Sequence, residues 1–386
     1  MKSIINYSQH CIDKSDLKSV EKSLKGNFLS QGPETLNFEK ALNKFFGSNY
    51  SCVVSSGTAA LHLIGKALNW RPKDIVITTP LTFAATANSI CYSGAIPQFV
   101  DIDSSTGNID LNEIEKKIKK KNKLKKKVKA VIAIDYAGNP CDWKGLRFLA
   151  NKYGIKLIND NCHALGAKYL NDKNYAVKYA DVVSQSFQSL KNITTGEGGA
   201  IITNNKKIFE KVKILRSHGI SKNLKKGEHW KNNMNILGYN YRLTDFQSSL
   251  GISQLKKVNF FMKKRAKIAS IYNHKLSQIE NITIPFIRKK DTHAYHLYPL
   301  QIDFKKIKKD KDKMFKYFLN KNYRLQVHYN PIYHYNFYKK KFNYKKKFFP
   351  NTENFFEREV SIPIFPNFKE KDQLRFINLL KKYLFY

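Results

Sequence analysis

The feature that most constrains the fold is a regular alternation of short apolar runs with segments of helical spacing. Between residues 50 and 161, five runs are rich in β-branched residues, and each of the first four is followed by a helical pattern. The runs are YSCVVSS, DIVITTP, IPQFVDID, VKAVIAIDYAG and IKLINDN, the last of which precedes a loop. Short apolar strands that alternate with helices are typical of parallel strands covered on both faces. The sequence therefore predicts an α/β fold.

The segments on either side of this alternation predict how the chain is divided. Two helices around 14–25 and 34–46, joined by the turn signal SQGP, precede it, and two β-rich runs, ADVVSQSF and GGAIITNN, follow it. After the tetrapeptide RSHG the alternation of strand-like and helical segments stops. A long helical stretch from Thr244 to about Gln278 is followed by the segments HAYHLYPLQID and YRLQVHY and by a closing helix. We expect a large domain over 1–245, with the N-terminal helices, and a connecting helix with a smaller α/β domain over 246–386.

The cysteine pattern and the lack of long apolar segments bear on where the protein works. The five cysteines are scattered and form no C-x-x-C pair, which argues against a zinc site or a disulfide framework and favours a reducing compartment. The N-terminal residues meet polar side chains too early for a secretory signal, and no apolar run reaches the roughly 20 residues that cross a bilayer. We expect a cytoplasmic protein with no metal site and no membrane partner.

The formal net charge of +39 has two interpretations: a polyanionic partner, or solvent-facing positions filled with lysine. The densest run, 116–127, continues a helical pattern as its polar end, and KKK recurs at 339–341 and 345–347. These runs contain hardly any arginines or interleaved aromatics of the kind that read bases. The distribution therefore favours lysine-rich surfaces over dedicated nucleic-acid binding, although a positive field would assist capture of a diphosphate substrate.

Two junctions between strands and following segments carry candidate binding groups. The segment SSGTAAL, 55–61, places small residues and free backbone N–H groups at a helix N-terminus, which suits an anion, although Ser-Gly-Thr is also an ordinary N-cap. Asp160, in LINDNCHALG, ends an apolar strand, where a carboxylate is costly unless it meets a cation or donors. It is either a capping residue or a carboxylate that keeps a pyridinium nitrogen protonated, as pyridoxal phosphate requires.

The third junction, SFQSLKNITTGEGG, contains one isolated lysine between two expected core strands. On a short loop between buried strands, Lys191 can be partly desolvated, which lowers its pKa and makes the amine nucleophilic enough for a Schiff base. Ser186 lies where its hydroxyl could reach the same phosphate as SSGT. Taken alone, Lys191 would be a surface loop lysine. The three junctions together, however, indicate one binding site.

These segments, with TPLTFAATANSI, VDID, RSHG and GYNYRL in this order, resemble the pyridoxal-phosphate-dependent sugar aminotransferases of the DegT/DnrJ/EryC1/StrS family over nearly the whole chain. The resemblance implies a fold type I transferase, in which a mostly parallel seven-stranded sheet is covered by helices, and a homodimer with shared active sites. It implies that Lys191 carries the cofactor covalently and that Asp160 pairs with the pyridine nitrogen. The other cofactor-binding positions that it implies are Gly57, Thr58 and Ser186 at the phosphate, Phe83 on the ring, His163, and Asn240, which reaches the phosphate from the second subunit.

Within the family the chain is most similar to the members that use glutamate to aminate C4 of a UDP-linked 4-keto-6-deoxy-N-acetylhexosamine in pseudaminic acid biosynthesis. The segments that carry this likeness are IDYAGNP, DNCHALGAKY, RSHGISK, HAYHLYP and QVHYNPIYHYNFY. It implies sugar contacts by Gln188, His328 and Tyr333. Gln188 departs from the family, because many members have histidine there, and we expect it to tune the sugar site.

Four alternatives remain to be weighed against this interpretation. The acceptor could be another nucleotide-linked keto sugar, of the perosamine or bacillosamine type. A sugar dehydratase is disfavoured, because relatives with that chemistry replace Lys191 by histidine. A basic nucleic-acid-associated or regulatory protein with a vestigial cofactor fold is opposed by the joint presence of Lys191, Asp160, Ser186 and Asn240. A nicotinamide dehydrogenase is disfavoured, because no G-x-G-x-x-G follows an early strand.

Overall fold

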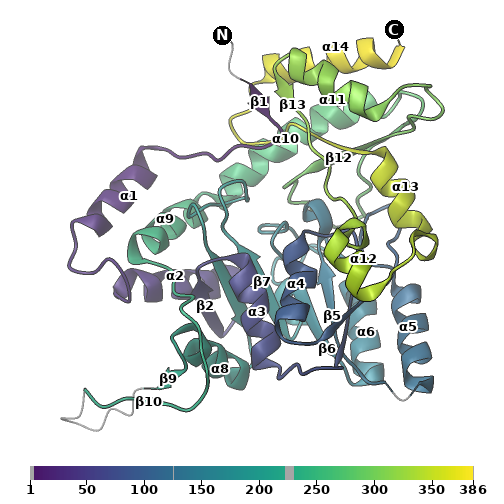
Figure 1. Cartoon of the computed structure of the whole chain (residues 1–386). Coiled ribbons are helices and arrows are strands. Elements are labelled where there is room, and N and C mark those ends of the chain that lie inside the picture. The colour runs from purple at the N-terminus through teal and green to yellow at the C-terminus, as the bar shows by residue number, and fades with distance from the viewer. Residues whose placement is uncertain (1–3, 125, 222–229, 386) are drawn as a thin grey trace.

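The core of the protein is a seven-stranded sheet in a computed structural model that describes residues 4–124, 126–221 and 230–385 (Figure 1). The strand order is β2-β8-β7-β6-β5-β3-β4, and all neighbours are parallel except β8, which runs antiparallel to both β2 and β7. The expected mostly parallel sheet is therefore confirmed. Its strands are β2 (Tyr50–Val54), β3 (Ile75–Thr78), β4 (Ile96–Phe99), β5 (Val128–Ile134), β6 (Lys156–Asp160), β7 (Val182–Ser186) and β8 (Gly199–Thr203).

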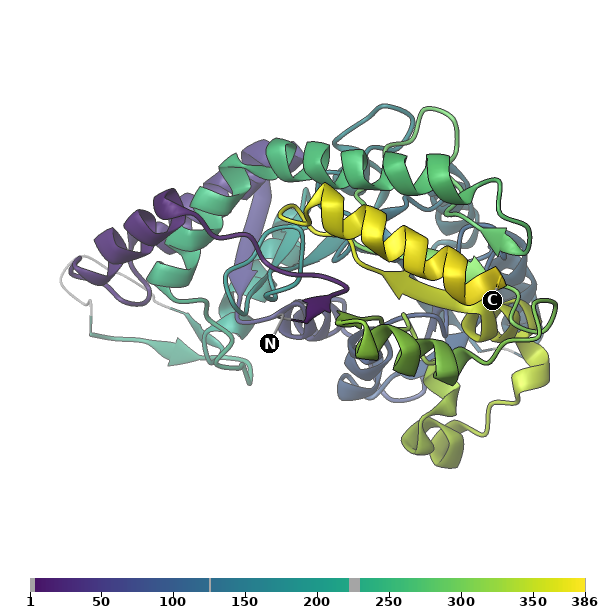
Figure 2. The same ribbon diagram turned by 90° about the horizontal axis from the view of Figure 1, so that it is seen from above.

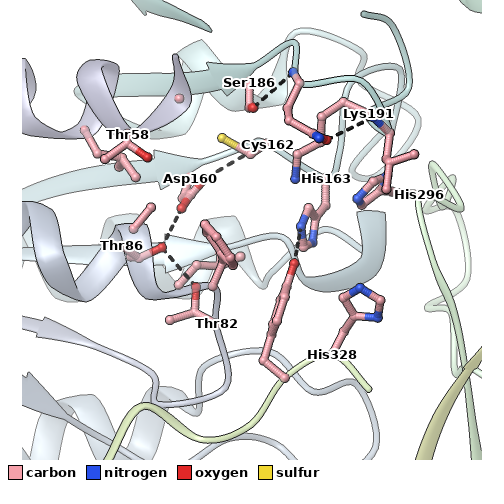
Figure 3. Close-up of a pocket in the computed structure, with 18 of the residues that line it drawn as sticks. Thr58, Thr82, Thr86, Asp160, Cys162, His163, Ser186, Lys191, His296 and His328 are labelled. Carbon is pink, nitrogen blue, oxygen red and sulfur yellow. Dashed lines mark hydrogen bonds between the residues drawn. The ribbon is translucent and has the colours of Figure 1, made fainter. Parts of the chain in front are cut away.

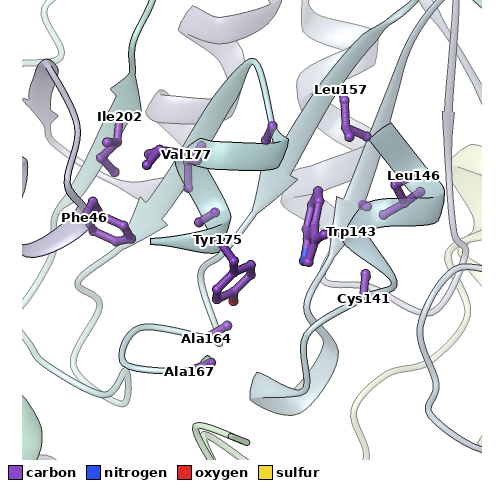
Figure 4. Close-up of a cluster of buried hydrophobic side chains, with 14 of the residues drawn as sticks. Phe46, Cys141, Trp143, Leu146, Leu157, Ala164, Ala167, Tyr175, Val177 and Ile202 are labelled. Carbon is purple, nitrogen blue, oxygen red and sulfur yellow. The ribbon is translucent and has the colours of Figure 1, made fainter. Parts of the chain in front are cut away.

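Helices cover both faces of this sheet, as the apolar strands require, since successive side chains point to opposite faces. Val53 and Leu157 contribute to a core shared with one set of helices, whereas Val54 and Ile158 contribute to the core on the other face. The first core, part of which Figure 4 shows, packs against α2 (Pro33–Phe46), α5 (Leu111–Lys123), α6 (Trp143–Tyr153) and α7 (Tyr175–Tyr179). The second packs against α3 (Gly57–Ala67), α4 (Ala84–Tyr92) and α8 (Lys206–Arg216).

The expected single helix after Thr244 is two helices, α9 (Asp245–Lys256) and α10 (Val258–Leu276). They are separated at Lys257, which lies outside the helical region of backbone space. Its amine is bonded to Asp13 and Asp16 at the N-terminus of α1 (Lys14–Leu24). This tertiary ion pair left no signal in the local apolar spacing. Figure 2 shows α10 lying beside the C-terminal helix α14 (Glu370–Phe385).

A second, antiparallel sheet with the order β11-β12-β14 lies in the C-terminal part of the chain. Its strands are β11 (Ile282–Thr283), β12 (Tyr298–Ile302) and β14 (Glu359–Ile362), and its apolar cluster includes residues of α10, α11 (Lys311–Asn320) and α14. The N-terminal strand β1 (Ile5–Asn6) pairs in parallel with β13 (Tyr323–Arg324), so the first described residues lie against the C-terminal part. The domain boundary at 245/246 stays a prediction. The remaining elements in the described part of the chain are β9 (Ile220–Ser221), β10 (Asn233–Met234), α12 (Asn336–Phe342), α13 (Pro350–Arg358) and three short 3-10 helices, Tyr136–Gly138, Ile332–His334 and Lys346–Phe348.

The described lysines of the runs lie at the surface. In α5 only Ile114 and Ile118 are buried; Lys120 and Lys123 of its last turn are exposed and Lys121 is half-buried, and the three lysines of α12 are exposed. Among the described residues, no helix is long and apolar enough to cross a membrane, and no group of three or more histidine, cysteine or acidic side chains could hold a metal ion.

Candidate active site

A cavity of about 750 Å³ opens at the carboxyl ends of the parallel strands (Figure 3). This is where an open parallel sheet binds its ligands, because the strand ends and the helix N-termini meet there. Its walls come from the N-terminus of α3, the turn before α4, the ends of β6 and β7, the loop around Lys191 and the segment 326–330.

Lys191 lies on the loop between β7 and β8, and its side chain is partly exposed because it faces the cavity. Its backbone N–H donates to Gln188 O at 2.9 Å, and the amide of the next residue, Asn192, donates to the backbone oxygens of Leu165 and Ala294. The loop is thereby fixed from two other segments of the chain. Protein surrounds the amine, and burial lowers the pKa of Lys191 from its ordinary value, which Asp160 and Cys162 oppose only in part.

Asp160 ends β6 with its carboxylate toward the cavity. Its Oδ2 accepts the hydroxyl proton of Thr86 at 2.8 Å, and Thr86 in turn lies 2.9 Å from the Thr82 hydroxyl. The side chain is nearly buried, at 5% exposure, yet no cation among the described residues forms an ion pair with it. A buried carboxylate of this kind is costly unless a ligand completes its partners.

Asp135, directly after the neighbouring strand β5, provides the contrast. Its two oxygens accept from the backbone N–H of Cys141, the indole N–H of Trp143 and the hydroxyl of Tyr175, at 2.8 to 2.9 Å, and from Asn161. All of its hydrogen-bonding capacity is used inside the protein, and it does not line the cavity. Asp135 is therefore a structural carboxylate, while Asp160 is available to a ligand.

The N-terminus of α3 forms an anion cradle at one end of the cavity. Gly57 and Thr58 open the helix, whose first backbone N–H groups have no partner within it, and Ser186 lies against them. A Cβ at position 57 would lie 2.8 Å from the Ser186 Cβ, so this close approach requires glycine. The preceding Ser56 uses its own hydroxyl to cap Ala59, which leaves the cradle to Gly57, Thr58 and Ser186.

Aromatic side chains also line the cavity beside these groups. The Phe83 ring is 59% exposed and lies 5.9 Å from the Tyr329 ring. The Tyr329 hydroxyl lies 2.9 Å from His163 Nε2, and among the described residues the buried His163 Nδ1 has no hydrogen-bond partner. Burial and the nearby Lys191 ammonium lower the pKa of His163 well below its ordinary value, so this imidazole is neutral.

The structure brings together most, but not all, of the residues that the sequence singled out. Gln188 and His328 line the cavity, whereas Tyr333 does not: it is 1% exposed, and its ring stacks on Phe349 at 4.7 Å in a separate apolar cluster. The expected contact of Tyr333 with the sugar stays a prediction, and the structure places this ring outside the cavity. Asn240 is exposed and lies outside this cavity, with its backbone paired to Ser217.

Several cavity residues were missed by the sequence analysis. Thr82 and Thr86 are one helical turn apart in TPLTFAAT, a spacing that could have placed them together beside one ligand. No pattern of spacing singles out the others, although most of them lie beside predicted residues or within the segments that carry the family likeness. They are Tyr7, Cys162, His296, Tyr329, Asn330 and Tyr335.

The donor set fits a phosphorylated pyridine aldehyde. The cradle that a Cβ at position 57 would fill suits a phosphate, the Asp160 carboxylate suits a protonated ring nitrogen, and Lys191 offers an amine of lowered pKa. The exposed Phe83 ring offers an aromatic wall.

Comparison with known proteins agrees with this geometry. Residues 10–381 match the DegT/DnrJ/EryC1/StrS aminotransferase family. The chain is 42% identical over 376 residues to an uncharacterized protein of Methanocaldococcus jannaschii, covering 96% of this chain and 95% of that protein. It is 39% identical over 369 residues to the UDP-4-amino-4,6-dideoxy-N-acetyl-beta-L-altrosamine transaminase of Campylobacter jejuni, covering 96% and 94%. The solved structure of Helicobacter pylori PseC, an aminotransferase involved in the biosynthesis of pseudoaminic acid, superposes with a TM-score of 0.91 at 34% identity, covering 99% of each chain.

Proposed function

We propose that this chain, which belongs to the DegT/DnrJ/EryC1/StrS aminotransferase family, transfers the amino group of L-glutamate to C4 of a UDP-linked 4-keto-6-deoxy-N-acetylhexosamine. Membership makes it an enzyme of the sugar aminotransferase type, with a sugar and an amino donor as substrates. The observation that carries the proposal is the convergence of Lys191, Asp160 and the α3 N-terminus on one cavity. The likeness to the C. jejuni transaminase supports the choice of sugar.

The cofactor that we propose is pyridoxal 5'-phosphate. Bound in the cavity, it would supply an electron sink for moving the amino group. Gly57, Thr58 and Ser186 would hold its phosphate, and Phe83 would cover one face of its ring. The Asp160 carboxylate, which Thr86 orients, would keep the ring nitrogen protonated.

Lys191 has two tasks in this proposal. Its Nζ would hold the cofactor covalently in the resting enzyme. Once released, the amine would take up the proton from the donor carbon and pass it on within the first half of the reaction, and it would deliver a proton to the acceptor carbon in the second half. Both tasks require a neutral amine, and burial favours that form by lowering the pKa of Lys191. His163 and His328 are buried beside it, and these imidazoles are neutral, since burial lowers both of their pKa values.

The experiment that tests the function combines spectroscopy with product analysis. The purified protein should be yellow, and borohydride should fix the cofactor to the peptide that contains Lys191. A panel of UDP-linked 4-keto sugars is then incubated with glutamate, and the aminated product is identified by mass spectrometry. A colourless protein that does not bind added pyridoxal phosphate contradicts the function, and activity on 3-keto sugars alone contradicts the choice of C4.

We also propose a homodimer in which Asn240 reaches the partner subunit's cofactor phosphate. Support comes from its position: Asn240 is exposed and outside its own chain's cavity, and the neighbouring Tyr239 and Tyr241 line an open hollow beside Ser56 and Thr58. A two-fold interface of this kind yields two equivalent sites.

Subunit mixing tests the shared site. Lys191→Ala subunits are mixed with Asn240→Ala subunits, each nearly inactive alone. In a heterodimer one site receives both defects and the other receives neither, so part of the activity should return. No recovery after verified subunit exchange means that Asn240 acts within its own chain.

A further inference from the structure

A chain of hydrogen bonds runs from the cavity into the C-terminal sheet through His328. The segment that carries His328 pairs with β14, where Ser361 N donates to Gln326 O at 2.8 Å. Glu359 and Ser361 are two residues apart in β14, so their side chains point to the same side of the strand. Both are fully buried and face His328.

The donors and acceptors in this series of hydrogen bonds have defined partners. The backbone N–H of His328 donates to Glu359 Oε2 at 2.9 Å, and the Ser361 hydroxyl donates to Glu359 Oε1 at 2.6 Å. His328 Nδ1 lies 2.7 Å from the same Ser361 oxygen. The imidazole ring lines the cavity, so the nitrogen that a ligand can reach is the opposite one, Nε2.

The number of protons fixes the direction of these bonds. An ionised carboxylate only accepts hydrogen bonds, and a serine hydroxyl has a single proton to give. When that proton goes to Glu359, the Ser361 oxygen is free only to accept, so His328 Nδ1 must carry a proton and donate it. Because burial, reinforced by Lys191, lowers the pKa of His328 to about 3, the ring is neutral and Nε2 then has a lone pair.

We propose that Glu359 and Ser361 are positioning residues that hold His328 in the tautomer with its proton on Nδ1, so that Nε2 presents a hydrogen-bond acceptor to a hydroxyl or ammonium group of a substrate in the cavity. The part of this inference that concerns substrate rests on the proposed function, whereas the tautomer does not. We call the hydrogen bonds from Glu359 through Ser361 to His328 Nδ1 the relay. The direction of its hydrogen bonds reverses when Glu359 takes up a proton. The carboxyl then donates to Ser361, Ser361 donates to Nδ1, and Nε2 carries the proton and becomes a donor.

The groups around Glu359 determine when that reversal occurs. Burial raises the pKa of the Glu359 carboxyl, and the Ser361 hydroxyl, the Lys311 ammonium of α11 and the His328 backbone N–H oppose the shift. The Tyr136 hydroxyl donates to His328 O, and the rings of Tyr7 and Tyr329 each lie 4.9 Å from the His328 ring. On the cavity side, Lys191 is the cation that faces His328. The acceptor form is therefore the form above the Glu359 pKa, and acidification converts it to the donor form.

The tautomer can be measured directly in the protein without any turnover. Long-range proton–nitrogen NMR of protein with ¹⁵N-labelled imidazoles separates protonated from bare ring nitrogens, and a His328→Gln sample assigns the His328 signals. At pH 8 we expect Nδ1 protonated and Nε2 bare. In Glu359→Gln the side-chain amide donates to Ser361, which reverses the relay, so we expect the proton on Nε2. A wild-type signal with the proton on Nε2, or an unchanged tautomer in Glu359→Gln, overturns the proposal.

Two further variants guard against misfolding as the cause. Ser361→Ala breaks the relay but keeps the bond from Glu359 to the His328 backbone, and it should leave His328 with a mixture of tautomers. Glu357→Gln is the matched control, because Glu357 is exposed and bonded to Lys305, away from the cavity, and its His328 spectrum should match wild type.

Kinetics test the substrate part separately. With the sugar nucleotide that the panel identifies, Glu359→Gln should raise KM about tenfold, the effect of losing one hydrogen bond, with a smaller change in kcat. The wild-type KM should rise as pH falls through the Glu359 pKa, while the variant should lack this dependence. If the tautomer reverses as expected but KM for both substrates is unchanged, the relay stands and its contact with substrate is refuted. If no sugar is aminated at all, the proposed function fails while the NMR result still decides the relay.

Discussion

Replacing His293 by asparagine should make the folded protein less sensitive to acid. His293 is 3% exposed, its Nδ1 accepts the backbone N–H of Tyr295 at 2.7 Å, and its ring stacks on that of Tyr295 at 4.3 Å. Burial lowers the pKa of His293 to about 3, because protonation would place a charge in the core. An asparagine oxygen can accept the same backbone N–H but cannot take up a proton in this range.

The size of the effect follows from linkage between protonation and folding. The unfolded histidine, with a pKa of about 6.5, binds a proton that the folded one does not, so the free energy of unfolding is highest above pH 6.5 and falls as the pH drops toward 3. The slope is about 1.4 kcal/mol per pH unit for one such group, which sums to about 2 kcal/mol at pH 5. The variant lacks this term. It should be less stable than wild type at pH 7.5, by about 1–3 kcal/mol for the lost ring packing, and the difference should shrink by about 2 kcal/mol at pH 5.

Urea unfolding at a series of pH values measures both numbers, with tryptophan fluorescence and far-UV circular dichroism recorded together to check that the transitions coincide. Comparison of variant with wild type cancels the other titrating groups, including Glu359, whose raised pKa acts in the opposite direction. His10→Asn, at an exposed position, is the control and should leave the pH dependence unchanged. Parallel stability curves for wild type and His293→Asn would show that His293 protonates in the folded state, and the reasoning would fail.

Three other substitutions probe the cavity and its frame. Gly57→Ala places a Cβ 2.8 Å from that of Ser186 and should weaken cofactor binding about tenfold or more, in a spectroscopic titration with pyridoxal phosphate. Asp160→Asn should lower kcat about 100-fold or more with little change in Tm, since it removes an electrostatic contribution and no packing; equal losses of activity and stability point to a capping role. Arg216→Ala should cost about 3–5 kcal/mol in urea unfolding, because it leaves the buried Glu39, bonded to Arg216 at 2.7 Å, without its cation, whereas Arg216→Lys should retain part of it.

The fold was predictable because its strands and helices are long enough to show a characteristic spacing of apolar residues in the sequence. The parallel strands are buried on both faces and read as apolar runs, and the helices of the large sheet follow them in order. What escaped prediction has no local period. The two-residue pairing of β1 with β13 depends on a distant segment, and Lys257, at the break between α9 and α10, bonds carboxylates more than 200 residues away in the sequence.

The site residues were predictable only where a residue type in its sequence context has few structural roles to choose from. Lys191 stood out because an isolated lysine between buried strands is unusual, and the structure places it in the cavity. Asp135 and Asp160 look alike in the sequence, as aspartates at the ends of apolar strands, and only the donors around them separate a structural carboxylate from an available one. Arg216 of RSHG, a segment that carries family resemblance, proves to join α8 to Glu39 and β2 and not to line the cavity.

The contrast between surface and cavity explains how a protein with a net charge of +39 can still lower the pKa of a lysine at its cavity. Charges on exposed lysines act through water and salt, which screen them beyond about 8–10 Å, so they shift the pKa of a distant buried group little. At the cavity, by contrast, burial is the largest cause lowering the pKa values of Lys191, His163, His296 and His328. Burial thereby disfavours the protonated forms of these basic groups around the Asp160 carboxylate. The many surface lysines therefore govern the electrostatic attraction of an anionic substrate. The chemistry depends instead on the few basic groups that the fold buries.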